Sequence, residues 1–98
     1  MKVFELEGWL AKRRVELDQR GIKVLFTQCE PTDNSAVYFD IDTHTTMARA
    51  IVWESMGLDL EAIELATGKK FISETHQAQD VTGVLHILSD FFARLEES

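Results

Sequence analysis

An apolar stripe near the C-terminal end constrains the possible folds of this chain more than any other feature. Between residues 81 and 95 large apolar side chains return every three or four positions, which is the spacing of one face of an α-helix. Asp80, just before the stripe, is a residue type that caps helix N-termini. A stripe this wide has to be covered, so the rest of the chain must supply a layer against which the helix packs. Its members are Val81, Val84, Leu85, Leu88, Phe91, Phe92 and Leu95.

A second amphipathic helix is predicted over residues 3–19. Three- and four-residue steps connect a stripe with charged residues on the opposite side, made up of Val3, Leu6, Trp9/Leu10, Arg13 and Leu17. Gly21 follows at the position where a left-handed C-terminal cap is common, and Arg20 suits the negative end of the helix dipole. The chain is therefore expected to have a helix at each end.

Between the helices, short β-prone runs alternate with turn signals. Three hairpin signals in succession are typical of an antiparallel meander. Gly57 is expected to take the positive φ of one of these turns. The alternation slips between Leu60 and Ile63, which either a β-bulge or a mixture of two faces would explain. The predicted strands are 22–27, 36–42, 47–55, 58–66 and 71–76, with a loop at 30–35 and turns at 43–46, 56–57 and 67–70.

These elements predict an α+β fold: an antiparallel meander sheet of four to five strands with the N- and C-terminal helices packed on one face. The other face of the sheet would be left to solvent. With 98 residues, the chain is expected to form a single domain, residues 1–98.

The charge is strongly and unevenly acidic. The formal net charge is −7, and after residue 20 the chain carries thirteen acidic side chains against five basic ones. Direct nucleic-acid binding needs a basic face, so this balance argues against it and favours a basic protein partner. Solubility alone is the alternative explanation, and it stays open.

The expected location is a reducing cytoplasm. Cys29 is the single cysteine, so no internal disulfide can form. The N-terminal residues lack the apolar run of a signal peptide, and no segment approaches the roughly 18 apolar residues of a membrane span. No membrane association is expected.

Asp40, Asp42 and His44 are the sharpest candidates for chemistry. On a strand, alternate residues project from the same face, so two carboxylates and an imidazole could bind a divalent metal or act as acid and base. The alternative is an acidic, solvent-facing strand beside a turn. No nucleophile, Gly-rich loop or further ligand pair completes a site, so we expect no enzyme activity, no catalytic residue, no metal and no cofactor.

Other reactive residue types are scattered. His76 and His86 lie ten residues apart without zinc-ligand spacing, and Cys29 has no basic neighbour to activate it. The basic run at residues 12–14 could hold a phosphate, but three such residues on an amphipathic helix usually form a solvated shoulder.

The strand at 47–53 carries the strongest indication of a binding surface. If Ala48, Ala50 and Val52 face a helix, the large alternate residues lie on the solvent face beside the next strand. The opposite assignment, with Ile51 and Trp53 in the core, also fits the alternation. On the first assignment the composition is that of a binding hot spot, with the predicted partner-binding residues Tyr38, Asp40, Asp42, Arg49, Trp53, Glu54 and Asp59.

The strand and turn pattern resembles that of a known protein family. The runs Phe39-Asp40-Ile41-Asp42, Ala48–Ser55, Leu58–Glu61 and Thr67-Gly68-Lys69 are similar to those of bacterial immunity proteins of polymorphic-toxin and contact-dependent growth inhibition systems, of the TriTu type. The resemblance covers about two thirds of the chain and rests on strands and turns. It implies a bacterial cytoplasmic toxin inhibitor whose partner is a cognate toxin domain, often a basic nuclease acting on tRNA. Some such toxins work together with elongation factor Tu.

We therefore predict an immunity protein that neutralises a toxin through protein–protein interaction. The alternative is a small non-enzymatic regulatory or structural subunit that self-associates through its open sheet face or an edge strand. In the first case, an acidic binder would occupy or cover the basic cleft of a nuclease.

Overall fold

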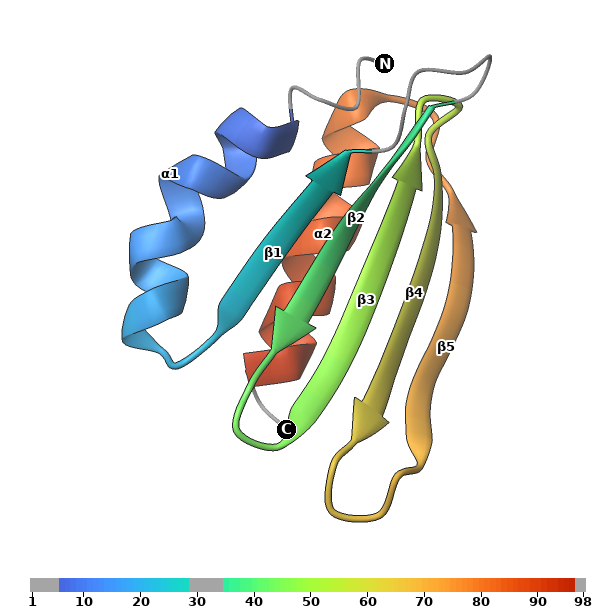
Figure 1. Cartoon of the computed structure of the whole chain (residues 1–98). Helices are drawn as coiled ribbons and strands as arrows, with labels where there is room; N and C mark the ends of the chain where they lie inside the picture. Colours follow the sequence, from blue (N-terminus) through green and yellow to red (C-terminus); the bar gives the residue numbers. More distant parts are fainter. Residues whose placement is uncertain (1–5, 29–34, 97–98) are drawn as a thin grey trace.

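The computed structural model describes residues 6–28 and 35–96, and it has the predicted α+β architecture (Figure 1). The predicted start of the first helix at residue 3, most of the loop around Pro31, and Cys29 lie outside the described residues. In chain order the elements are α1 (Leu6–Gln19), β1 (Lys23–Gln28), β2 (Ala36–Asp42), β3 (Thr46–Trp53), β4 (Gly57–Glu64), β5 (Lys70–Gln77) and α2 (Val81–Glu96).

The five strands form one antiparallel sheet in the order β1-β2-β3-β4-β5, which confirms the predicted meander. The helix α2 runs behind the sheet, and α1 lies alongside β1 (Figure 1). Gly21 adopts a φ of +77° after α1, as expected for a helix C-cap. Residues of both helices join the inner face of the sheet in one apolar core.

Phe39 lies at the centre of this core and is fully buried. Its ring centroid is 5.2 Å from that of Phe26, 6.3 Å from that of Phe92 and 6.4 Å from that of Trp9, in edge-to-face arrangements. Aromatic pairs in this geometry gain free energy beyond the burial of their area. The cluster therefore ties β1, β2, α1 and α2 together.

The apolar stripe of α2 is buried where it crosses the sheet. Five of its seven residues are buried, whereas Leu85 is half-buried and Val81 is exposed. The predicted cap is present: the Gly83 N–H donates to Asp80 Oδ1 at 2.7 Å. The buried members are Val84, Leu88, Phe91, Phe92 and Leu95.

The turn between β3 and β4 corrects one prediction. Met56, not Gly57, has positive φ, at +68°, and Gly57 is the first residue of β4. The Met56 N–H donates to the Trp53 carbonyl at 2.8 Å, so the turn closes one residue earlier than expected. A left-handed backbone costs a non-glycine residue about 1–2 kcal/mol. The Met56 side chain, which packs against the core, offsets part of this cost.

Both explanations proposed for the break in the apolar alternation near Ile63 apply, but each concerns a different strand. Within β4 the alternation is regular: Leu58, Leu60 and Ala62 are buried, and Ile63 lies on the open face. The extra residue is in β5, because Ala62 pairs with Ile72 and Ile63 pairs with Lys70. Phe71 is therefore the bulged residue.

Candidate binding face

The sheet surface opposite the helices is uncovered by any described element, and we call it the open face. On β3, Ala50 and Val52 are fully buried beneath the helices, so Arg49, Ile51 and Trp53 project from the open face. The register places Ile51 across from Tyr38 and Arg49 across from Asp40. Of the two assignments that the sequence left open, the structure has the one with Trp53 on the solvent side.

Trp53 has small neighbours on both sides. Its cross-strand partner on β2 is Ala36, and on β4 it lies beside Gly57. A Cβ atom built on Gly57 would be 3.8 Å from Trp53 Cε3. Because neither neighbour has a side chain beyond Cβ, neither can cover the half-buried indole. Part of a large amphipathic ring is therefore available to a partner.

Arg49 organises the middle of the open face. Its Nε donates to Asp40 Oδ1 at 2.7 Å, and its guanidinium carbon lies 5.2 Å from the centroid of the Tyr38 ring. The hydrogen bond and the charge of Asp40 raise the pKa of Arg49 above its usual value. Together these contacts hold an arginine, a tyrosine and a carboxylate in one arrangement on two adjacent strands.

The acids of the open face are largely balanced by cations. Besides the Asp40–Arg49 pair, Glu61 pairs with Lys70 Nζ at 2.9 Å, and Asp59 accepts a hydrogen bond from Thr75 Oγ1 at 2.9 Å. Over the described strands, the face carries four carboxylates against three cations. These are Asp40, Asp42, Asp59 and Glu61, with Lys23, Arg49 and Lys70. The net charge of −7 is therefore spread over the molecule and is not concentrated on this face.

Two of the predicted residues lie at the margins. Asp42 is exposed at the end of β2, between Lys23 and Met47 on the adjacent strands. Glu54 belongs to the β3–β4 turn, where its N–H donates to the Ser35 carbonyl at 2.9 Å. The remaining predicted residues, Tyr38, Asp40, Arg49, Trp53 and Asp59, lie within the face.

A depression of about 180 Å³ lies between β3 and β4 on this side, lined by Asp40, Met47, Ala48, Arg49, Glu61 and Ile63. Met47 at its margin is 55% exposed, and Leu25 on β1 is 65% exposed. Apolar surface of this kind, rimmed by ion pairs, is a common setting for protein–protein contact.

The groups considered for metal binding or catalysis are dispersed. Asp40 is engaged by Arg49, and His44 Nε2 lies 3.0 Å from the position that a Cβ on Gly21 would take. Within residues 6–28 and 35–96, no three His, Cys, Asp or Glu side chains gather as metal ligands. His86 belongs to a different element, α2, where it is exposed.

His76 belongs to an ion-pair network on the covered side of β5. Its Nε2 lies 2.9 Å from Glu74 Oε1, and Glu74 accepts two hydrogen bonds from Arg94 of α2, at 2.8 and 3.0 Å. The hydrogen bonds from Arg94 and His76 lower the pKa of Glu74 to about 2. The network joins α2 to β5.

The basic run of α1 is mostly used within the protein. Arg13 stacks on Trp9, with its guanidinium carbon 4.7 Å from the ring centroid. Arg14 Nη1 donates to the Val24 carbonyl at 2.9 Å, so it satisfies an acceptor on the outer edge of β1. Lys12 is exposed on α1. All three side chains are exposed, as expected for a solvated shoulder, and two of them are engaged within the protein, which argues against a phosphate site.

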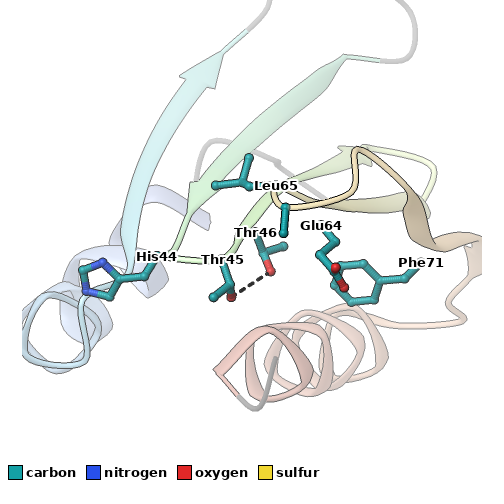
Figure 2. A pocket seen from close by; sticks show the side chains of 7 residues that line it. His44, Thr45, Thr46, Glu64, Leu65 and Phe71 are labelled. Carbon is teal, nitrogen blue, oxygen red and sulfur yellow. Dashed lines mark hydrogen bonds between the residues drawn. The ribbon is translucent and has the colours of Figure 1, made fainter.

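A groove at one end of the sheet was not foreseen from the sequence. It has a volume of about 670 Å³ and is lined by the β2–β3 and β4–β5 turns together with Phe71 (Figure 2). Leu65 and Phe71 are 49% and 46% exposed there. Two large apolar residues beside the Thr67–Lys70 turn were the available signal, but the bulge that positions Phe71 could not be assigned from sequence.

Comparison with known proteins adds one match. The family model described as Immunity protein TriTu matches residues 4–94, which is nearly the whole chain. A search of curated proteins finds no match. In the described part of the chain, neither helix has the length and apolar character needed to cross a membrane.

Proposed function

The chain belongs to the TriTu family of immunity proteins, and from that premise we propose that its open face binds a cognate toxin domain and blocks its activity. We further propose that the toxin is a basic nuclease that cleaves tRNA, delivered by a contact-dependent growth inhibition system. The immunity protein would then act in the bacterial cytoplasm, without catalysis of its own.

The observation that carries this proposal is the surface around Trp53 and Arg49. Both helices lie on the other side of the sheet, so no described element competes for the open face. Trp, Tyr and Arg are the residue types most enriched where binding energy concentrates. Here Trp53, Tyr38 and Arg49 lie on two adjacent strands, with Arg49 already oriented by Asp40.

Charge supports a basic partner through the field of the whole molecule. A net charge of −7 on 98 residues attracts a basic protein over distances of about a Debye length, roughly 8–10 Å at physiological salt. Because the open face itself is nearly balanced, the field raises the rate of encounter, whereas the aromatic residues determine how long the complex lasts. A nuclease whose RNA cleft is covered in this way cannot bind its substrate.

Cellular protection tests the function. The cognate toxin domain, sought first in the neighbouring gene, is expressed with the immunity protein, and growth is recorded. We expect the unaltered protein and Val15→Ala, which trims an exposed apolar residue on α1, to protect equally, and Trp53→Ala to protect poorly. Growth arrest despite abundant unaltered protein would refute the immunity function. Purified elongation factor Tu is then added to the toxin–immunity complex, to test whether it binds the toxin while the immunity protein is bound.

Self-association is a second candidate, favoured by the edge of β5. The Ala78 N–H donates to the Met56 carbonyl, so Ala78 is a hydrogen-bonded position of the β4–β5 pair. Hydrogen-bonded positions alternate along an antiparallel strand. The backbone N–H and C=O groups of Ser73, Thr75 and Gln77 therefore point away from β4, toward the free edge. At the other edge of the sheet, on β1, the Val24 carbonyl already accepts a hydrogen bond from the Arg14 side chain. If β5 pairs with a second copy, sedimentation will show a dimer that Thr75→Pro abolishes. A monomer at all concentrations would exclude this candidate.

A further inference from the structure

The groove at the end of the sheet has a defined architecture. The β2–β3 turn forms one side, where Thr43 Oγ1 accepts hydrogen bonds from the backbone N–H groups of Thr45 and Thr46 at 3.2 and 3.0 Å. Thr46, which is only 1% exposed, lies across from Glu64 in the sheet. The β4–β5 turn forms the other side, and the Leu65 N–H donates to the Thr45 carbonyl at 2.9 Å. The two turns are therefore held in a fixed relation.

The β4–β5 side of the groove is largely apolar, whereas His44, Thr45 and Thr46 line the β2–β3 side. Leu65, Ala66 and Phe71 line the apolar side, and the bulge in β5 is what places Phe71 there as an extra residue (Figure 2). Leu65 and Phe71 each leave almost half of their surface exposed. Exposed apolar side chains that line a concavity indicate a contact surface.

One carboxylate enters this apolar setting. Glu64 lines the groove with Phe71, and among the described residues it has no ion-pair partner within 4.0 Å. The contrast with Glu61, three residues earlier on the same strand, is direct, because Glu61 is paired with Lys70. A cation from outside the chain would complement the groove.

We propose that this groove receives an arginine side chain of the toxin, an inference that rests on the proposed function. The guanidinium would pair with the Glu64 carboxylate and stack on the Phe71 ring, while the aliphatic stem lies along Leu65 and Ala66. Arginine suits this combination better than lysine, because its planar cation both stacks on aromatic faces and binds carboxylates in a two-pronged manner. Thr46 and Glu64 directly adjoin Met47 and Ile63 of the open face. Because successive strand side chains alternate between the two faces, Glu64 projects from the side opposite Ile63. A toxin that fills the groove and also covers the open face therefore has to wrap around this end of the sheet.

The direct test uses a small probe in place of the toxin. N-acetyl-arginine methylamide is titrated into the isotope-labelled protein, with the neutral citrulline analogue as control. We expect saturable NMR shifts at Glu64, Leu65 and the Phe71 ring for the arginine probe, and a several-fold weaker response in Glu64→Gln. Asp18→Asn, which removes a charge from α1, serves as the matched control. Equal shifts with citrulline, or arginine shifts confined to other surfaces, would overturn the assignment.

The same variants separate this inference from the proposed function. In the toxin complex, Glu64→Gln should weaken binding about tenfold, the scale of a lost charge-assisted contact, and Asp18→Asn should have no effect. If unaltered protein protects cells and Glu64→Gln binds the toxin as tightly as the unaltered protein, the groove assignment is wrong and the function stands. If unaltered protein gives no protection, the proposed function fails, and the toxin as occupant fails with it.

Discussion

The two tryptophans show how differently the two sides of this sheet are used. Trp9 of α1 lies against Phe39 and Phe92, with Arg13 over its ring. Trp53 is half-buried like Trp9, but its cross-strand neighbours are only Ala36 and Gly57, on the side of the sheet that the helices leave uncovered. The first contributes to folding, whereas the second is left available for a partner. The same division extends to whole faces of the sheet.

On the covered face, apolar residues of alternate strand positions are sealed by the helices, and the few charges there, such as Glu74 and Arg94, serve to attach α2. On the open face, charges pair across strands and surround exposed apolar side chains. A single set of strands thus carries a folding surface and a binding surface. Substitutions should therefore affect stability on one face and binding on the other.

The largest effect is expected for Leu88→Ala on α2. Leu88 is fully buried, so its truncation should lower the free energy of unfolding by about 2–5 kcal/mol. Met47→Ala on the open face, where the residue is 55% exposed, should cost under about 0.5 kcal/mol. Urea denaturation of both variants measures the difference. Similar losses in the two would mean that the faces are not divided as described.

The helix cap offers a smaller test of the covered side. Asp80→Ala removes the acceptor of the Gly83 N–H, and should destabilise the protein by about 1 kcal/mol. Asp42→Ala removes an acid from the open face and should change stability by less than about 0.5 kcal/mol. Thermal unfolding distinguishes them. A greater loss from Asp42→Ala would give that residue a structural role that its exposure does not indicate.

Acid should weaken the attachment of α2 to β5. Bonds from Arg94 and His76 lower the pKa of Glu74 from 4.5 to about 2, so their stabilisation is complete above pH 4.5 and is lost as the pH falls toward 2. The groups are about one third exposed, so the contribution should stay below about 1 kcal/mol. Glu74→Gln should flatten the pH dependence of unfolding in this window. An unchanged slope between pH 4.5 and 2 would refute the linkage.

Charge reversal tests whether position on the open face matters for association. Asp42→Lys with Asp59→Lys and, as a matched pair on α1, Glu7→Lys with Asp18→Lys both change the net charge from −7 to −3. We leave Asp40 intact because it holds Arg49. At low salt, the open-face substitutions should slow toxin association about threefold more than the α1 substitutions do. This difference between the two variants should vanish at high salt. Equal slowing would mean that net charge alone attracts the toxin.

The sequence is enough to predict elements whose signals are local. The stripe around Leu88, the cap at Asp80 and the turn glycines at 21 and 68 all depend on near neighbours, and each is present. The meander order follows from short turns between adjacent strands.

Features that depend on register could not be predicted. Ala50 and Ile51 are both apolar, so alternation alone does not decide which of them faces the helices. The Asp40–Arg49 pair needs the β2–β3 register, and the bulge at Phe71 needs the β4–β5 register. Met56 takes the turn position expected of Gly57, because closure of the backbone outweighs the preference of glycine for positive φ. In each case, contacts between strands decide between conformations that the local sequence allows.

The division of the two faces is tested most directly by the dissociation rate of the toxin complex. Trp53→Ala and Val15→Ala each trim an apolar side chain, one on the open face and one on α1. We expect Trp53→Ala to speed dissociation about 30-fold or more, the effect of losing a hot-spot residue, and Val15→Ala to leave the rate unchanged. A complex that keeps its lifetime in Trp53→Ala, or that loses it in Val15→Ala, would contradict the open face as the toxin-binding surface.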